Sequence, residues 1–291
     1  MLTEFIYRSE EDYSPQKDNY LTPVYFEKEA LVPFIYSQNY NCEFMSETYG
    51  VLIFEEDSIP FGINSKKHLI FWLGDLRRLP DKLKMILKPY NINSDWDIES
   101  DFKTGQVEGL FTENILEVEL FLLLNKINIE FKKKFGFKMF NFDLILVDDL
   151  LKMCSEYKNR IIFNNEKDFK IIVSDLNVRF IETINRRELV YYLKSNQIIF
   201  DSNWGSLKIL EVFFKEMLSD NSNMIAPFFY LYDLRTWADH LVGRGMFEEV
   251  IKLLGLKNDS SFEEIYNCLT NQIYRSLEVV LNKVKNMKNS I

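Results

Sequence analysis

Histidine is almost missing from this chain, whose 291 residues include only His68 and His240. The three cysteines lie far apart and form no Cys-x-x-Cys pair, so neither a zinc knuckle nor a disulfide scaffold has support: Cys42, Cys154 and Cys268. Glycine-rich phosphate-binding motifs and the Gly-x-Ser-x-Gly motif are absent too, which removes support for a nucleotide-binding fold or an α/β-hydrolase. The sequence therefore predicts no metal site and no cofactor.

Glycine and proline are also scarce, at 10 and 7 residues, which excludes a collagen-like or linker-dominated chain. A hydrophobic fraction of 47% with 15% aromatics excludes a disordered one, and the length suits one large or two ordinary domains. Uncharged apolar runs of about 18 residues are lacking, and the first residues do not have the pattern of a signal peptide. We therefore expect a cytoplasmic protein with no membrane partner.

Basic residues are in deficit only in the first part of the chain. Residues 1–115 hold 20 acidic and 11 basic side chains, so the whole net charge of −9 lies there, and residues 116–291 are neutral. An acidic surface repels phosphate backbones, so any nucleic-acid contact is expected in the neutral part. The charge asymmetry predicts two units with different surfaces.

Short apolar and aromatic runs between Pro, Gly, Asn and Asp residues predict strands in residues 1–115, at 24–26, 32–36, 50–54 and 69–73. A short helix is predicted over 79–87, before Pro89. His68 follows two lysines at the start of the last strand, and we expect it to be a surface residue. We interpret residues 1–115 as a β-rich acidic domain for sensing or partner binding.

The pattern changes near Thr112, where apolar residues at helical spacing begin. They predict a helix over 115–134, ended by Gly136, and a second over 142–157. Residues 160–163 and 169–173 resemble strands, and residues 187–195 a helix. The assignment of residues 135–200 to either domain stays open.

The last ninety residues have the clearest helical pattern, with predicted helices at 207–218, 225–241, 246–254 and from a capping box to about 285. Ser260 and Glu263 fit that capping box. The predicted fold class is α+β: a β-rich domain over 1–115, then a mostly helical domain over 116–291 that ends in a bundle at about 204–288.

Arg235 and His240 are the candidate catalytic residues, in an Arg-x4-His pattern near the end of a predicted bundle helix. An arginine offers a planar fork of donors to a phosphate, and a histidine can move a proton near neutral pH. These are sufficient parts for metal-independent RNA cleavage by an adjacent 2′-hydroxyl. Five residues on an ideal helix turn through roughly 140°, so both side chains share a site only if the helix ends between them.

The segment that carries this motif resembles the HEPN family of helical domains, whose active members have Arg-x(4–6)-His at a helix end. Thr236 stands where that family commonly has a polar residue, often asparagine. The resemblance implies an endoribonuclease of bacterial toxin or phage-defence type, in which Arg235 binds the scissile phosphate and His240 acts in acid/base catalysis. It also implies RNA as substrate, a homodimer, and an antitoxin or sensor as partner. We add Arg244 as a second, substrate-binding phosphate contact.

The alternative is a non-catalytic recognition protein that dimerises through the bundle and binds its partner through the N-terminal domain. Many HEPN-like domains have lost catalysis and serve as interaction modules. Residues 70–80, Ile-Phe-Trp-Leu-Gly-Asp-Leu-Arg-Arg-Leu-Pro, resemble a segment of uncharacterised bacterial proteins that end in similar helical domains. Under this interpretation, changes near Trp72–Asp75 abolish function and His240→Ala does not.

Two further charged groups have simpler explanations. Asp143, Asp148 and Asp149 could ligate a metal, but adjacent carboxylates on a helix diverge and no histidine is near, which favours a solvated face. The run Lys132–Lys134 could contact nucleic acid, but it also places positive charge at a helix C-terminus, where the helix dipole favours it.

Overall fold

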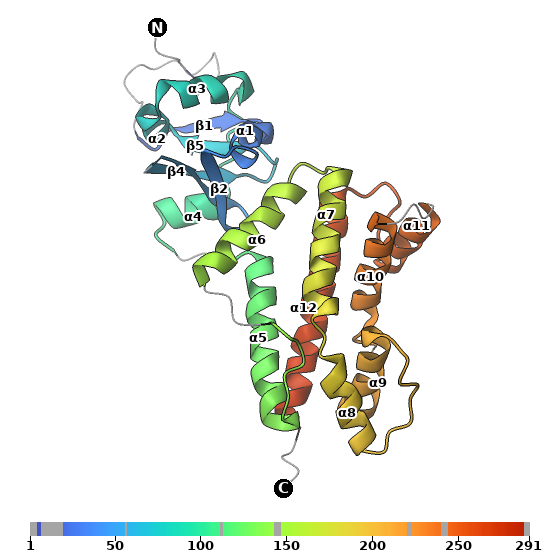
Figure 1. The fold of residues 1–291 in the computed structure, drawn as a ribbon. Coiled ribbons are helices and arrows are strands. Elements are labelled where there is room, and N and C mark those ends of the chain that lie inside the picture. Colours follow the sequence, from blue (N-terminus) through green and yellow to red (C-terminus); the bar gives the residue numbers. More distant parts are fainter. Residues whose placement is uncertain are drawn as a thin grey trace. The chain divides into compact units, whose positions relative to one another are not determined.

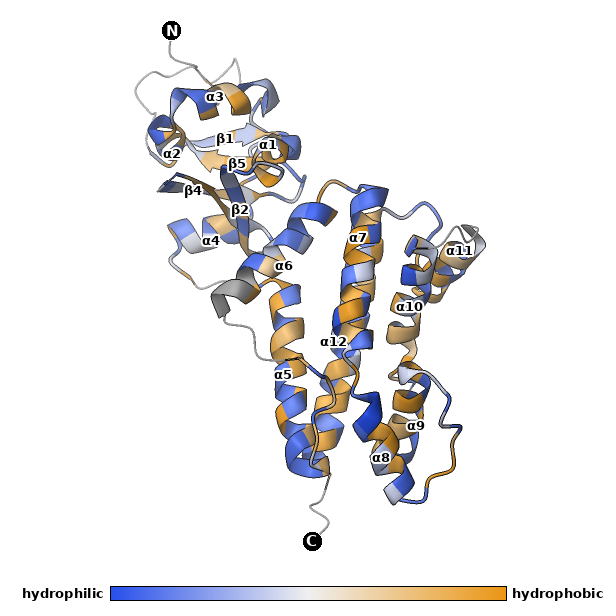
Figure 2. Ribbon diagram, viewed as in Figure 1, coloured by the Kyte–Doolittle hydropathy of each residue, from blue (hydrophilic) through white to orange (hydrophobic). Residues whose placement is uncertain are grey.

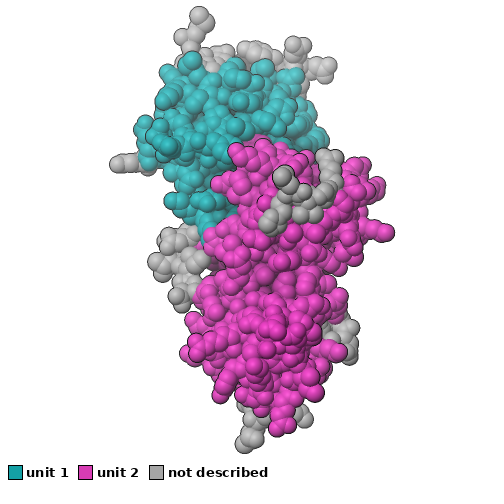
Figure 3. All heavy atoms as spheres, turned by 45° about the vertical axis from the view of Figure 1, so that its right-hand side comes forward, with its two compact units in different colours: residues 1–115, 151–159 teal, residues 116–150, 160–291 magenta. Residues whose placement is uncertain are grey.

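The computed structural model describes residues 5–6, 20–55, 57–110, 113–142, 147–219, 223–239 and 244–287, without the side chains of 147–149, 151 and 244 (Figure 1). The chain forms two compact units (Figure 3). Unit 1 comprises residues 1–115 and 151–159, and unit 2 comprises residues 116–150 and 160–291. Unit 1 contains a sheet and unit 2 is helical, so the predicted α+β class is confirmed.

Unit 1 is built on a six-stranded sheet in the order β2-β3-β4-β5-β1-β6, in which every paired neighbour is antiparallel. The strands are β1 Pro23–Phe26, β2 Tyr40–Ser46, β3 Tyr49–Phe54, β4 Asp57–Ile63, β5 Leu69–Trp72 and β6 Asn91–Ile92. Buried and partly exposed residues alternate along β3, as expected for a strand with one face on a core, whereas all of β5 is buried. The strands predicted at 24–26 and 50–54 are confirmed, and the one predicted at 69–73 ends at Trp72, because Leu73 begins a helix.

Short helices complete unit 1: α1 Val32–Ile35, α2 Leu73–Arg78, α3 Asp81–Leu87, α4 Asp101–Val107, and the 3-10 turns η1 Lys28–Leu31 and η2 Lys88–Tyr90. The strand predicted at 32–36 is wrong, because Pro33 lies in the first turn of α1, where its fixed φ and missing N–H are tolerated. The Trp72–Asp75 element leaves β5 directly into α2.

A helix segment closes one edge of the sheet. Residues 151–159 belong to α6 (Val147–Ile161) and pack on β2 within unit 1. The Ser155 hydroxyl accepts a hydrogen bond from the Phe44 N–H at 3.0 Å, and the Asn159 amide donates to the Cys42 carbonyl at 2.8 Å. An unpaired strand edge is a template for aggregation, and these side chains bond backbone groups of β2 that face away from β3.

Unit 2 consists of long helices: α5 Leu116–Phe135, α7 Glu166–Asn177, α8 Arg186–Ser195, α9 Ser206–Leu218, α10 Ala226–Asp239, α11 Arg244–Leu253 and α12 Phe262–Asn286. A π-helical turn, η3 Val178–Glu182, follows α7. Helix α5 packs against α12, and α7 packs along α10. Hydrophobic and hydrophilic residues occur together on these helices (Figure 2), as expected where one side of each helix packs against its neighbours.

Three local predictions in this unit are corrected. Residues 160–163 and 169–173 are not strands, because the first run includes the end of α6 and the second lies inside α7, whose N-cap is Asn165. The capping box is one residue later than predicted: the Ser261 hydroxyl accepts from the Glu264 N–H, and the Glu264 carboxylate accepts from the Ser261 N–H. Among the described residues, no helix is both long and apolar enough to cross a bilayer.

Candidate functional site

The last turn of α10 carries the described part of the Arg-x4-His motif. Arg235 is about one third exposed, and its Nε lies 2.7 Å from the Asp239 Oδ2, one turn further along the helix. The other oxygen of Asp239, Oδ1, accepts a hydrogen bond of 2.7 Å from the Ser174 hydroxyl on α7. Asp239 therefore links the arginine of α10 to the neighbouring helix.

The other two predicted site residues are not placed beside Arg235 by the structure. His240 lies outside the described residues, immediately after the last described residue of α10. Arg244 begins α11, but its side chain is not described. Thr236, the residue after the arginine, donates its hydroxyl proton to the Tyr232 carbonyl at 2.9 Å, so it is bonded to its own helix.

A groove of about 840 Å³ lies beside this helix end, between α7 and the end of α10. Residues of both helices line it: Asn165, Glu166, Lys167, Lys170, Ile171, Ser174, Ala238 and Asp239. The groove is open to solvent rather than enclosed. Sequence analysis missed this groove, because the lining residues around α7 lie more than sixty positions before Ala238 and Asp239 and were partly taken for a strand.

The charged residues of the groove are mostly arranged in pairs. The Lys170 ammonium lies 2.8 Å from a Glu166 carboxylate oxygen and 4.5 Å from the centre of the Trp237 ring. Asp239 is paired with Arg235. Lys167 is exposed and makes no ion pair with a described residue, so the groove has one cation beyond its paired charges. An anion that enters is therefore not repelled by a free carboxylate of the described lining.

Asp233 lies on α10, two residues before Arg235. Burial, and to a smaller extent the Glu249 carboxylate of α11, raise the pKa of Asp233. Two positions on a helix differ by about 200°, so Asp233 and Arg235 point in nearly opposite directions. We therefore keep Asp233 separate from the groove.

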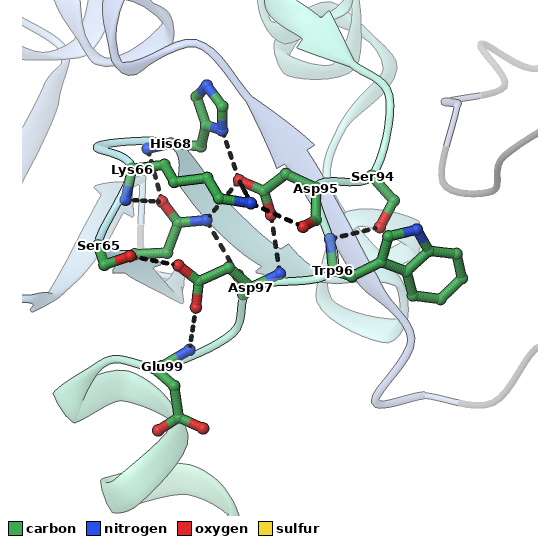
Figure 4. A network of polar contacts seen from close by, with 9 residues as sticks. Ser65, Lys66, His68, Ser94, Asp95, Trp96, Asp97 and Glu99 are labelled. Carbon is green, nitrogen blue, oxygen red and sulfur yellow. Dashed lines mark hydrogen bonds and ion pairs between the residues drawn. The ribbon is translucent and has the colours of Figure 1, made fainter.

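A second polar site lies in unit 1, where the loop 94–99 meets the turn between β4 and β5 (Figure 4). The buried Asn64 donates to an Asp95 carboxylate oxygen at 2.8 Å and to the Asp97 carbonyl at 2.9 Å. The His68 Nδ1 lies 2.6 Å from the same Asp95 oxygen, Oδ2. His68 is only about one quarter exposed, so it is a partner of this loop rather than the surface residue we expected.

The pKa values of the two aspartates in this loop, Asp95 and Asp97, are both lowered. Partial burial raises the pKa of Asp95, but hydrogen bonds from His68, the Asp97 N–H and Asn64 outweigh burial and lower it. The Ser65 hydroxyl and the Glu99 N–H likewise lower the pKa of Asp97. The bonds from Asn64, Ser65 and His68 fix the loop on the turn between β4 and β5.

We expect the free energy of unfolding to fall less steeply with decreasing pH in Asp95→Asn than in wild type. Because the pKa of Asp95 is lower in the folded chain, its carboxylate stabilises the fold above the unfolded pKa, and this contribution disappears as pH falls through the folded pKa. Urea unfolding of wild type and variant should differ most near neutral pH and converge in strong acid. A constant difference at all pH values would contradict this role.

The remaining predicted groups divide into described and undescribed ones. Lys132–Lys134 form the last turn of α5, as the dipole argument predicts. Asp143 and the side chains of Asp148 and Asp149 lie outside the described part of the chain. Among the described residues, no three His, Cys, Asp or Glu side chains form a group that could hold a metal ion.

Against known proteins, the chain matches no family model, no curated protein and no solved structure.

Proposed function

We propose that the protein is a metal-independent endoribonuclease of bacterial toxin or phage-defence type, with Arg235 and His240 as its catalytic residues. The observation that supports this best is the position of Arg235: it is partly exposed near the end of α10, and its partner Asp239 lines a groove that can accept an anion. His240 follows Asp239 directly in sequence. We place this activity in the cytoplasm, in a homodimer controlled by an antitoxin or sensor.

In the proposed reaction the 2′-oxygen of a ribose attacks the adjacent phosphorus and the bond from phosphorus to the 5′-oxygen breaks. The products are a 2′,3′-cyclic phosphate and a free 5′-hydroxyl. One proton leaves the 2′-hydroxyl and one joins the leaving 5′-oxygen, and His240 serves in this proton transfer. Arg235 binds the negative oxygens of the scissile phosphate, and Arg244 is the second phosphate contact.

The experiment is cleavage of single-stranded RNA by the full chain in the presence of EDTA, comparing wild type with Arg235→Ala. The proposal expects cleavage by wild type, cyclic phosphate ends on the products, and loss of both in the variant. Activity that EDTA abolishes, or equal cleavage by both chains, would contradict it.

A different observation favours the recognition protein as a second candidate. Trp96 is 65% exposed and has a φ of +60°, while Asp95 and Asp97 on either side of it are bonded to the turn between β4 and β5 (Figure 4). An exposed tryptophan on a fixed loop is typical of the residues that dominate protein interfaces. Trp72 and Asp75 are each only 2% exposed, so they belong to the core and are poor probes of a surface.

Under this second candidate, Trp96→Ala should abolish the growth arrest that expression of the chain causes. Its free energy of unfolding should stay within about 0.5 kcal/mol of wild type. Tryptophan and alanine both have a Cβ, so each is strained at the positive φ of position 96, and the substitution tests the indole ring. The measurement pairs growth arrest on expression with thermal unfolding. An unchanged effect in Trp96→Ala, together with its loss in His240→Ala, would refute this candidate.

A further inference from the structure

A stripe of α7 faces the groove. Lys167, Lys170 and Ser174 follow one another at steps of three and four residues, which places them on one side of a helix, and all three line the groove. The opposite wall is the end of α10, with Ala238 and Asp239. Two lysines therefore line the same groove as Asp239, the ion-pair partner of Arg235.

We infer that this groove binds the phosphodiester backbone of single-stranded RNA next to the scissile bond, with Lys167 and Lys170 as phosphate contacts and Asp239 as the residue that orients Arg235. The inference rests on the proposed nuclease for the identity of its ligand. The groove itself is built entirely from described residues of unit 2.

The ion pair explains the role of Asp239. Its carboxylate holds the Nε of Arg235 at 2.7 Å and is itself held by the Ser174 hydroxyl. A guanidinium binds phosphate oxygens through a planar fork of N–H donors. A carboxylate fixed to the neighbouring helix and bonded to Nε therefore fixes the direction of the Arg235 guanidinium.

The lysines differ in how they can respond to a phosphate. Lys167 is exposed and unpaired among the described residues, so a phosphate can bind it without breaking an ion pair. Lys170 is bonded to Glu166 and lies on the Trp237 ring, which restricts its position. Ile171 is 42% exposed and, with Ala238, provides apolar lining for a ribose or a base.

The test measures binding separately from cleavage. A fluorescein-labelled 2′-O-methyl oligouridylate has the RNA backbone but no free 2′-hydroxyl, so the wild-type chain can bind it without cutting it. Fluorescence anisotropy at several salt concentrations gives the affinity and its salt dependence. Each of Lys167→Ala and Lys170→Ala should weaken binding about tenfold and reduce the slope of log affinity against log salt by about 0.7.

Lys208 provides a matched control for Lys170. It lies on α9, away from the groove, and has the same two kinds of partner: Glu211 at 2.8 Å and the Phe229 ring at 5.2 Å. Lys208→Ala should keep wild-type affinity and slope. Equal weakening in the control and in the groove variants, or no weakening in the groove variants, would overturn the inference.

Asp239→Asn tests the positioning role. The change removes a negative charge, so general electrostatics predicts tighter binding of RNA. If Asp239 orients Arg235, kcat for RNA cleavage falls about tenfold while KM is unchanged or lower, and an unchanged kcat contradicts this role.

A chain that binds the methylated probe in the groove but cuts no RNA would refute the nuclease and keep the groove. RNA cleavage that is unchanged in Lys167→Ala and Lys170→Ala would support the nuclease and refute the groove as its RNA-binding site.

Discussion

Replacing His240 with alanine is expected to reduce cleavage of single-stranded RNA by about 10²- to 10⁴-fold, the usual contribution of a general acid or base. The reason is that no other histidine can replace it, because the chain has only two histidines and the other, His68, is bonded to Asp95. A neutral alanine cannot move the proton that the reaction requires. The measurement is the initial rate of RNA cleavage by the purified full chain in EDTA, with folding checked by circular dichroism.

His68→Ala is the matched control, since it removes the same side chain from the other unit. His68 is bonded to Asp95, so its loss affects the loop 94–99 rather than α10. The control should cleave RNA at the wild-type rate even if it unfolds at a lower temperature. Equal rates in wild type and His240→Ala would eliminate the nuclease and leave the recognition protein as the remaining proposal.

The helices of unit 2 could largely be predicted from sequence, because each buries one face and its apolar residues therefore recur at helical spacing. The helices predicted at 207–218 and 187–195 correspond to α9 and α8 within one residue at each end. Helix α7 was missed because four of the five residues of Phe169–Val173 are apolar. A short apolar run of this kind does not distinguish a strand from a helix.

The sites were harder to predict than the fold. Asp95 lies 27 residues from His68 and 31 from Asn64 in sequence, and nothing in the local pattern joins them. The same holds for Ser174 and Asp239, which are 65 residues apart. Arg235 could be singled out because its motif is local, whereas the groove beside it depends on how α7 packs along α10.

Gly50→Ala is expected to have the largest effect on stability, about 3 kcal/mol. Gly50 lies in β3 opposite Phe44 of β2 and Phe61 of β4, and the rings of these two residues meet edge to face with their centres 5.4 Å apart. The rings of two strands that both flank β3 can approach this closely because Gly50 has no side chain between them. A Cβ at this position would lie 2.3 Å from the Phe61 ring and 2.8 Å from the Glu43 carbonyl oxygen.

Neither neighbour can move at low cost, because Phe44 and Phe61 are fully buried and the Glu43 oxygen belongs to the backbone. Thermal unfolding of the full chain should therefore show the transition of Gly50→Ala lowered by about 5 °C or more. Gly245→Ala is the control: nothing lies within 4 Å of the Cβ it would add on α11, and alanine is the better helix former. A melting temperature of Gly50→Ala at or above that of Gly245→Ala would show that the two rings do not depend on the glycine.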